Sequence, residues 1–160
     1  MSMNEQEVVK IVAAAVEKCR QKEMNLALAK ALIGKVETEA RKMNVAAVVA
    51  VTDRSAHPVA VHSMDGAYIA SYDIALNKAF TSAGLKMSTA KLGRLSQPGQ
   101  PLYGIQHTND GKIVIFGGGE VLEADGHIIG ALGVSGGSTE EDTALAAYGK
   151  KILGEVLTCL

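Results

Sequence analysis

The residues whose types and spacing best suit them for chemistry lie in two glycine clusters near the C-terminus. The first cluster is Gly117–Gly119, and the second, Gly130–Gly137, leads into Ser138–Asp142. This last segment twice places a Ser or Thr three residues before a carboxylate, a spacing typical of a helix start. A glycine-rich turn before a helix offers unpaired backbone N–H groups to an anion. The pattern predicts either an anion cradle or a tight structural turn that needs glycine.

The same region lacks the spacing of a nucleotide fingerprint, G-x-G-x-x-G or G-x-x-x-x-G-K-[ST]. A second turn, Asp65–Gly66, precedes a predicted helix that carries Lys78, and Asp142 lies in the first turn of the last predicted helix. A lysine and a carboxylate near two helix starts would orient a small anion, or would pair with each other as a structural ion pair.

The four histidines are His57, His62, His107 and His127, and none belongs to an H-x-x-x-H or H-E-x-x-H pattern. His62 and Asp65 together make an incomplete metal set. Haem needs as few as one axial protein ligand, often a histidine, so a single residue beside an irregular loop, such as His107, is compatible with haem. An ordinary solvated histidine is the alternative interpretation of each.

Composition narrows the class of protein. The chain has 160 residues, a net charge of −1 and 21% charged residues, with no basic run, so nucleic-acid binding is not expected. Cys19 and Cys159 suggest neither a disulfide framework nor a zinc site. The apolar run Val45–Val51 is too short to span a bilayer. We therefore expect a cytoplasmic protein, and the small apolar side chains favour a homo-oligomer.

Hydrophobic periodicity predicts the elements that must position these residues. Apolar residues at helical spacing predict helices over Asn4–Glu23, Asn25–Met43, Ala67–Gly84 and Glu140–Thr158. Apolar runs predict strands over Val45–Thr52, Val59–His62, Ile113–Phe116 and His127–Val134. The proline- and glycine-rich stretch Arg94–Asn109 reads as an irregular loop. Strands joined as hairpins and flanked by helices predict an α+β domain with an antiparallel sheet.

Five motifs, in order, resemble the GlcG/HbpS-type family, which includes the C-terminal haem-binding domain of PduO proteins. The motifs are Val48-Val-Ala-Val-Thr-Asp53, His62-Ser-Met-Asp-Gly-Ala67, Ala75-Leu-Asn-Lys-Ala79, Ile115-Phe-Gly-Gly-Gly119 and Ile129-Gly-Ala-Leu-Gly-Val-Ser-Gly136. The resemblance runs from about Asn25 to Val156. It implies a profilin-like fold of α/β/α layers with a five-stranded antiparallel sheet, and a homo-oligomer.

The resemblance also implies haem binding, sometimes with haem degradation. The ligand-binding residues that match the family pattern are Asp65, Gly66, Ala67, Lys78, Gly118, Gly119, Gly133, Ser135, Gly136 and Asp142. The iron ligand lies outside these motifs, and His107 remains its candidate. The adenosyltransferase domain of PduO has no counterpart in this chain, so that activity is not implied.

The segment before Asn25 is additional to the resemblance. It resembles the short amphipathic peptides that target enzymes into bacterial microcompartments, which divides the chain into a helix over 1–24 and a domain over 25–160. One apolar stripe suits this helix to a groove on a shell or cargo protein, reached through residues 1–22. The alternative is an ordinary helix packed on its own domain.

Three functions follow from these residues. The first is a haem- or tetrapyrrole-binding accessory protein of a bacterial microcompartment. The second is a protein that binds or converts a small carboxylate or aldehyde through the glycine-rich turns, Lys78 and Asp142. The third is a non-catalytic assembly or cofactor-protecting subunit.

Overall fold

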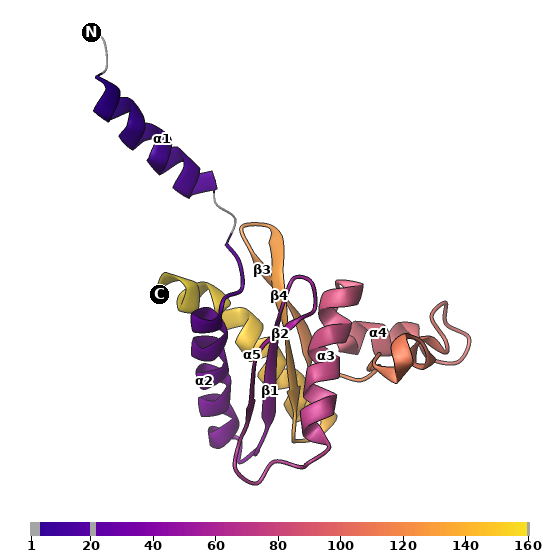
Figure 1. The fold of residues 1–160 in the computed structure, drawn as a ribbon. Helices are drawn as coiled ribbons and strands as arrows, with labels where there is room; N and C mark the ends of the chain where they lie inside the picture. Colours follow the sequence, from indigo (N-terminus) through magenta and orange to yellow (C-terminus); the bar gives the residue numbers. More distant parts are fainter. Residues whose placement is uncertain (1–3, 20–21, 160) are drawn as a thin grey trace.

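The computed structural model describes residues 4–19 and 22–159, and the side chains of 16–19 are not described. The elements, in chain order, are α1 (Glu5–Cys19), α2 (Leu26–Lys42), β1 (Val48–Asp53), β2 (Pro58–Ser63), α3 (Ser71–Leu85), α4 (Thr89–Leu95), the short 3-10 turns η1 (Ile105–His107) and η2 (Asn109–Gly111), β3 (Gly119–Ala124), β4 (His127–Ser135) and α5 (Thr139–Thr158) (Figure 1). None of the described helices is long and apolar enough to cross a membrane.

The strands form one antiparallel sheet in the order β2-β1-β4-β3. In register, Val49 pairs with His62 on one side and with Val134 on the other. The predicted pairing of the first two strands as an antiparallel hairpin, with the last strand in the same sheet, is confirmed. β1 starts beside Ser135 at one end of the sheet and finishes beside Gly130 at the other end. These two ends of the sheet carry different surfaces, which are described separately below.

The expectation of five strands is wrong, because the described residues form a sheet of four. The predicted strand Ile113–Phe116 is irregular, and β3 begins only at Gly119. Ile113 and Val114 are buried, but the backbone N–H of Val114 donates to the Thr81 hydroxyl of α3 at 3.0 Å. This apolar run therefore packs beneath a helix and bonds to its side chain instead of pairing with a strand.

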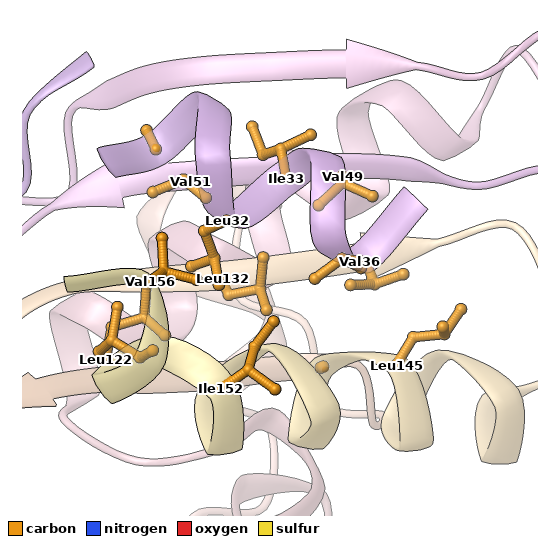
Figure 2. Packing of buried hydrophobic residues seen from close by; sticks show 14 of the residues in the cluster. Leu32, Ile33, Val36, Val49, Val51, Leu122, Leu132, Leu145, Ile152 and Val156 are labelled. Atoms are coloured by element: carbon orange, nitrogen blue, oxygen red, sulfur yellow. The ribbon is translucent and has the colours of Figure 1, made fainter. Parts of the chain in front are cut away.

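Helices cover both faces of the sheet (Figure 1). α2 and α5 pack on one face, where Val49, Val51 and Leu132 point toward Leu32 and Ile152 (Figure 2). α3 packs on the other face, against Val48 and Ala50. Because adjacent strand residues point to opposite faces, β1 is buried on both sides, which explains its continuous apolar sequence.

α3 approaches the sheet closely because the residues beneath it are small. Ala50, Gly133 and Gly119 are neighbours across three strands, and Ala75 and Ala79 face the sheet. A Cβ built on Gly133 would collide with the Ala75 carbonyl oxygen and lie 2.7 Å from the Ala79 nitrogen. Gly133 lies inside β4, within the predicted strand His127–Val134, and its missing side chain makes room for the helix.

Part of the predicted loop Arg94–Asn109 belongs to a helix that sequence periodicity missed. α4 begins after Ser88, whose hydroxyl accepts the Lys91 N–H at 3.2 Å. The Thr89 hydroxyl accepts the N–H of Gly119 at 2.9 Å, which ties α4 to the start of β3. A helix this short carries too few turns to show a periodic stripe.

α1 projects away from the layered domain (Figure 1). Val8, Val9, Ile11 and Val12 are 41%, 62%, 55% and 53% exposed. Val16 and Cys19, which continue the apolar spacing of the helix predicted over Asn4–Glu23, lie outside the residues described in full, as does Gln21. The chain rejoins the domain at Met24, which is buried in the core.

Gly133→Ala should destabilise the protein by about 3 kcal/mol, because the added Cβ cannot fit beneath the backbone of α3. The matched control is Gly154→Ala in α5, where a Cβ meets nothing within 4 Å and alanine should stabilise the helix by about 1 kcal/mol. Urea unfolding of both variants measures the difference. A neutral Gly133→Ala would show that α3 does not rest on this glycine.

Candidate functional site

A buried ion pair lies where β4 ends. The Lys78 ammonium of α3 donates to Asp142 Oδ2 at 2.7 Å and to the Val134 carbonyl at 2.8 Å. Lys78 is 0% exposed and Asp142 is 3% exposed. Since α3 and α5 cover opposite faces of the sheet, the pair joins the two faces around the end of the strand. Of the two sequence interpretations, the structure favours the structural ion pair.

The glycine motif Gly117–Gly119 forms the cover of this pair. A Cβ on Gly118 would lie 2.7 Å from the Lys78 nitrogen and 2.9 Å from Asp142 Cβ, and its φ of +111° favours glycine. The Gly118 carbonyl accepts the Val134 N–H at 2.8 Å. Phe116 places its ring 4.9 Å from the ammonium, within the range of a cation–π interaction. Gly118 is therefore required for close approach to the lysine ammonium, whereas Gly117 makes room for Thr143.

Burial lowers the pKa of Lys78 below its ordinary value of 10.5, and the hydrogen bond and negative charge of Asp142 oppose that shift. An ammonium removed from water loses its hydration, which favours the neutral amine. The carboxylate and the Val134 carbonyl replace part of that hydration. Lys78 of α3 is thus held by one partner from β4 and one from α5.

The start of α5 is already occupied by the chain's own carboxylates. The Gly137 N–H donates to Asp142 Oδ1 at 2.9 Å, and the Ser138 N–H donates to Glu141 Oε2 at 2.7 Å. The Ser138 hydroxyl accepts the Glu141 N–H at 3.2 Å and completes a capping box. Because these groups would have to be displaced by an external anion, the geometry argues against the predicted anion cradle.

The remaining motif residues surround this end of the sheet in separate roles. Gly66 and Gly136 line one cavity of about 470 Å³, beside Tyr68 and Glu141. The Ser135 hydroxyl bonds to that of Ser71 at 3.1 Å. Of the rest, Ala67 packs at the edge of the α3 core, Asp65 is exposed, and Gly119 and Gly133 pair inside the sheet. The structure brings the residues of the predicted ligand site to one end of the domain. Some of them pack in the interior, and others line the cavity beside Tyr68.

A larger cavity, of about 750 Å³, lies at the opposite end of the sheet. Its walls come from four segments: the chain before α2, the β1–β2 turn, the end of α3 and the start of β4. The apolar lining residues are Met24, Ala83, Ile128 and Ile129, and the basic ones are Lys22, Arg54, Lys86 and His127. None of the predicted ligand-binding residues lines this cavity, because its walls come from segments that are far apart in the chain.

The histidines differ in their surroundings. His62 Nδ1 lies 2.8 Å from Glu37 Oε1, so its predicted neighbour Asp65 is not the partner that the structure shows. His107 is exposed in η1, with its Nε2 3.4 Å from the Gln106 amide nitrogen. Within the described part of the chain, no three His, Cys, Asp or Glu side chains gather closely enough to hold a metal ion. His127 is the histidine that lines the large cavity.

Lys78→Met should cost about 3–5 kcal/mol of unfolding free energy, because it leaves Asp142 buried without its cation. Adding Asp142→Asn to Lys78→Met should cost less than the sum of the two single changes. The control is Lys150→Met at the exposed pair with Glu120, which should cost less than about 1 kcal/mol. Denaturant unfolding of all variants gives the coupling, and additive costs would contradict it.

The pH dependence of Lys78→Met checks the same pair. Between the lowered pKa and 10.5 the unfolded chain holds a proton on Lys78 that the folded chain has lost, so wild-type stability rises with pH in this window. The stability difference between wild type and Lys78→Met should therefore grow as the pH approaches 10.5. A constant or falling difference would show that the pKa is not lowered.

Comparison with known proteins identifies the family to which this chain belongs. Residues 24–151 match the family described as "Haem degrading protein HbpS-like". The chain is 44% identical over 123 residues (77% of this chain, 87% of the relative) to an uncharacterised 15.0 kDa protein of the dhaT-dhaS intergenic region of Citrobacter freundii.

Two further proteins are also similar. The corrinoid adenosyltransferase PduO of Salmonella typhimurium is 39% identical over 107 residues (67% of this chain), and the match spans about a third of PduO, 32%. The crystal structure of the PduOC:heme complex is similar at 33% identity and a TM-score of 0.78, over 81% of this chain and 94% of that one. The matched span covers the sheet, the Lys78–Asp142 pair and most of α5, and the chain belongs to the HbpS-like family.

Proposed function

We propose that this protein is a haem- or tetrapyrrole-binding accessory protein associated with a bacterial microcompartment. The observation that carries the haem part is that a protein of the same fold, 33% identical, has been solved as a haem complex. The match to PduO, which spans only 32% of that protein, gives no ground for the adenosyltransferase reaction.

The large cavity offers an imidazole, cations and some apolar surface to such a ligand, beside two carboxylates of its own, Glu23 and Asp53. Its volume of about 750 Å³ is ample for a ligand site. His127 supplies an imidazole, and Lys86 and Arg54 supply cations for ligand carboxylates. Met24 and Ile129 belong to the apolar lining. Bound haem would supply an iron that takes an axial protein ligand and exchanges electrons.

The residues of this cavity have distinct roles in the proposal. His127 would hold the iron, and Lys86 would fix the orientation of a carboxylate at the rim. Arg54 is 3.7 Å from Glu23, and Lys22 is 3.5 Å from Asp125, both in exposed pairs. Exposed ion pairs contribute little stability, so these cations are available to a ligand. We propose His127 as the iron ligand instead of the sequence candidate His107 of η1, because both are exposed but only His127 lines this cavity.

His127→Ala should weaken haem binding at least about tenfold, because an iron ligand is lost. Titration with haemin, followed by the Soret absorbance, gives the affinity of each variant. His57→Ala is the matched control, since this exposed histidine belongs to the β1–β2 turn but does not line the cavity. A loss confined to His107→Ala would move the iron site to η1, and the absence of any Soret shift would exclude haem binding.

The microcompartment part of the proposal concerns α1. Its sequence resembles targeting peptides, and its apolar side chains Val8, Ile11 and Val12 are exposed on one face. An amphipathic helix with an unburied stripe suits a hydrophobic groove on a shell or cargo protein. Among the residues described in full, the domain's core begins at Met24 and includes no residue of α1.

A reporter fused to residues 1–22 should enter microcompartments in a host that makes them. Val12→Glu should abolish this, because a carboxylate in the apolar contact costs several kcal/mol when it loses water. Gln6→Glu, a charge on the polar side of α1, is the matched control and should retain targeting. Fluorescence microscopy reads out the location. The protein without residues 1–22 should stay folded, and unfolding on truncation would place α1 in the core.

A further inference from the structure

We propose that α1 of one copy of this chain docks in the apolar groove between α2 and α5 of a second copy. This contact uses the same stripe of α1 that the proposed function assigns to a shell or cargo protein, so one α1 serves one partner at a time. The reporter fused to residues 1–22 lacks the groove, so it tests the shell contact separately. The groove is lined by residues of the two helices that cover one face of the sheet, and by Cys159. Its floor is formed by Ala31 of α2 and by Tyr148, Ile152 and Val156 of α5.

The size and character of the groove suit a short apolar stripe. Its volume is about 250 Å³, enough for a few aliphatic side chains and too small for a folded ligand domain. Ile152 and Val156 belong to the core beneath it, so the floor is firm. Tyr148 adds an aromatic ring, a residue type enriched in protein interfaces. These features match the helix-in-groove mode of recognition.

α1 carries the complementary surface. Val8, Ile11 and Val12 recur at helical spacing and are 41%, 55% and 53% exposed. Glu5 and Glu7 belong to the first turn of the same helix. An unpartnered stripe of this kind in water favours association with another apolar surface.

The charges beside the two surfaces are also complementary. Lys35 of α2 and Glu155 of α5 both line the groove, and Lys151, outside its lining, is exposed on α5 one turn before Glu155. Docking of the stripe would bring Glu5 and Glu7 toward these lysines. Because such rim pairs steer orientation more than they add affinity, they would select one direction of α1 along the groove.

The occupant comes from a second copy because α1 of the same chain projects away from the layered domain (Figure 1). Met24 is buried in the core, and Lys22 and Glu23 pair with Asp125 and Arg54 at the turns of the sheet. The chain before α2 is therefore held at the end of the sheet, and α1 leads outward from α2 and α5 (Figure 1). Two copies can exchange their helices reciprocally, which closes a symmetric dimer.

Disulfide trapping tests this contact, because Cys159 is a free, exposed cysteine that lines the groove. In a Cys19→Ser background, Val12→Cys should form a covalent dimer with Cys159 on oxidation. Gln6→Cys on the polar side of α1 is the matched control and should give little dimer, and Cys159→Ser should abolish the product. Non-reducing electrophoresis of the full chain reads out the species.

Two other results of the trapping experiment would each contradict the proposed contact. An intramolecular disulfide, seen as a monomer of altered mobility, would show that α1 folds back on its own domain and would overturn the proposal. Equal trapping of Gln6→Cys and Val12→Cys would show unspecific collision and would also overturn it.

A charge exchange gives a readout without cysteine chemistry. Lys35→Glu should lower the fraction of dimer measured by light scattering, and Glu7→Lys in the same chain should restore it. If light scattering gave the wild-type fraction of dimer for both Lys35→Glu and Val12→Glu, the proposal would be overturned. Haem titration of these variants should be unaltered, so this contact and the haem proposal can fail separately.

Discussion

The fold depends on how a fully buried lysine is kept in a protein interior. An ammonium that loses water is costly unless a carboxylate and further acceptors replace its hydration. Lys78 obtains these partners from the start of α5 and the end of β4. Each partner is available only when the helices on both faces of the sheet are in place. The pair therefore makes the positions of α3, β4 and α5 mutually dependent.

This constraint explains why the glycine motifs occur where they do. Gly118 leaves space for the ammonium, while Gly119 and Gly133 let α3 approach the sheet. If α3 were farther from the sheet, Lys78 could not reach around the end of β4. A sequence pattern that looks like a ligand-binding turn is thus largely explained by the packing around one ion pair. The end of the sheet with the predicted motifs is accordingly the more tightly packed, and the larger cavity lies at the other end.

Sequence reasoning succeeded where burial leaves a pattern in neighbouring residues. β1 is buried on both faces, so its run of β-branched residues predicted a strand, and α2 shows its apolar stripe because one side faces the core. β3 was missed because Gly119-Glu-Val-Leu-Glu-Ala124 mixes small and charged residues, and its pairing depends on β4. Ile113–Phe116 has the stronger strand propensity, yet contact with α3 overrides it. The Lys78–Asp142 pair could be foreseen as one alternative, whereas the cavity around His127 could not, since its four walls meet only in the folded chain.

The chain before α2 connects this cavity to α1. Lys22, Glu23 and Met24 line the cavity, and the same residues attach the chain before α2 to the domain. A ligand that drew Lys22 or Arg54 from their exposed pairs would loosen that attachment, because each pair is weak by itself. Met24, buried in the core, would still hold the chain. Occupation of the cavity and the orientation of α1 therefore share a small set of contacts, and any coupling between ligand and helix must act through these residues.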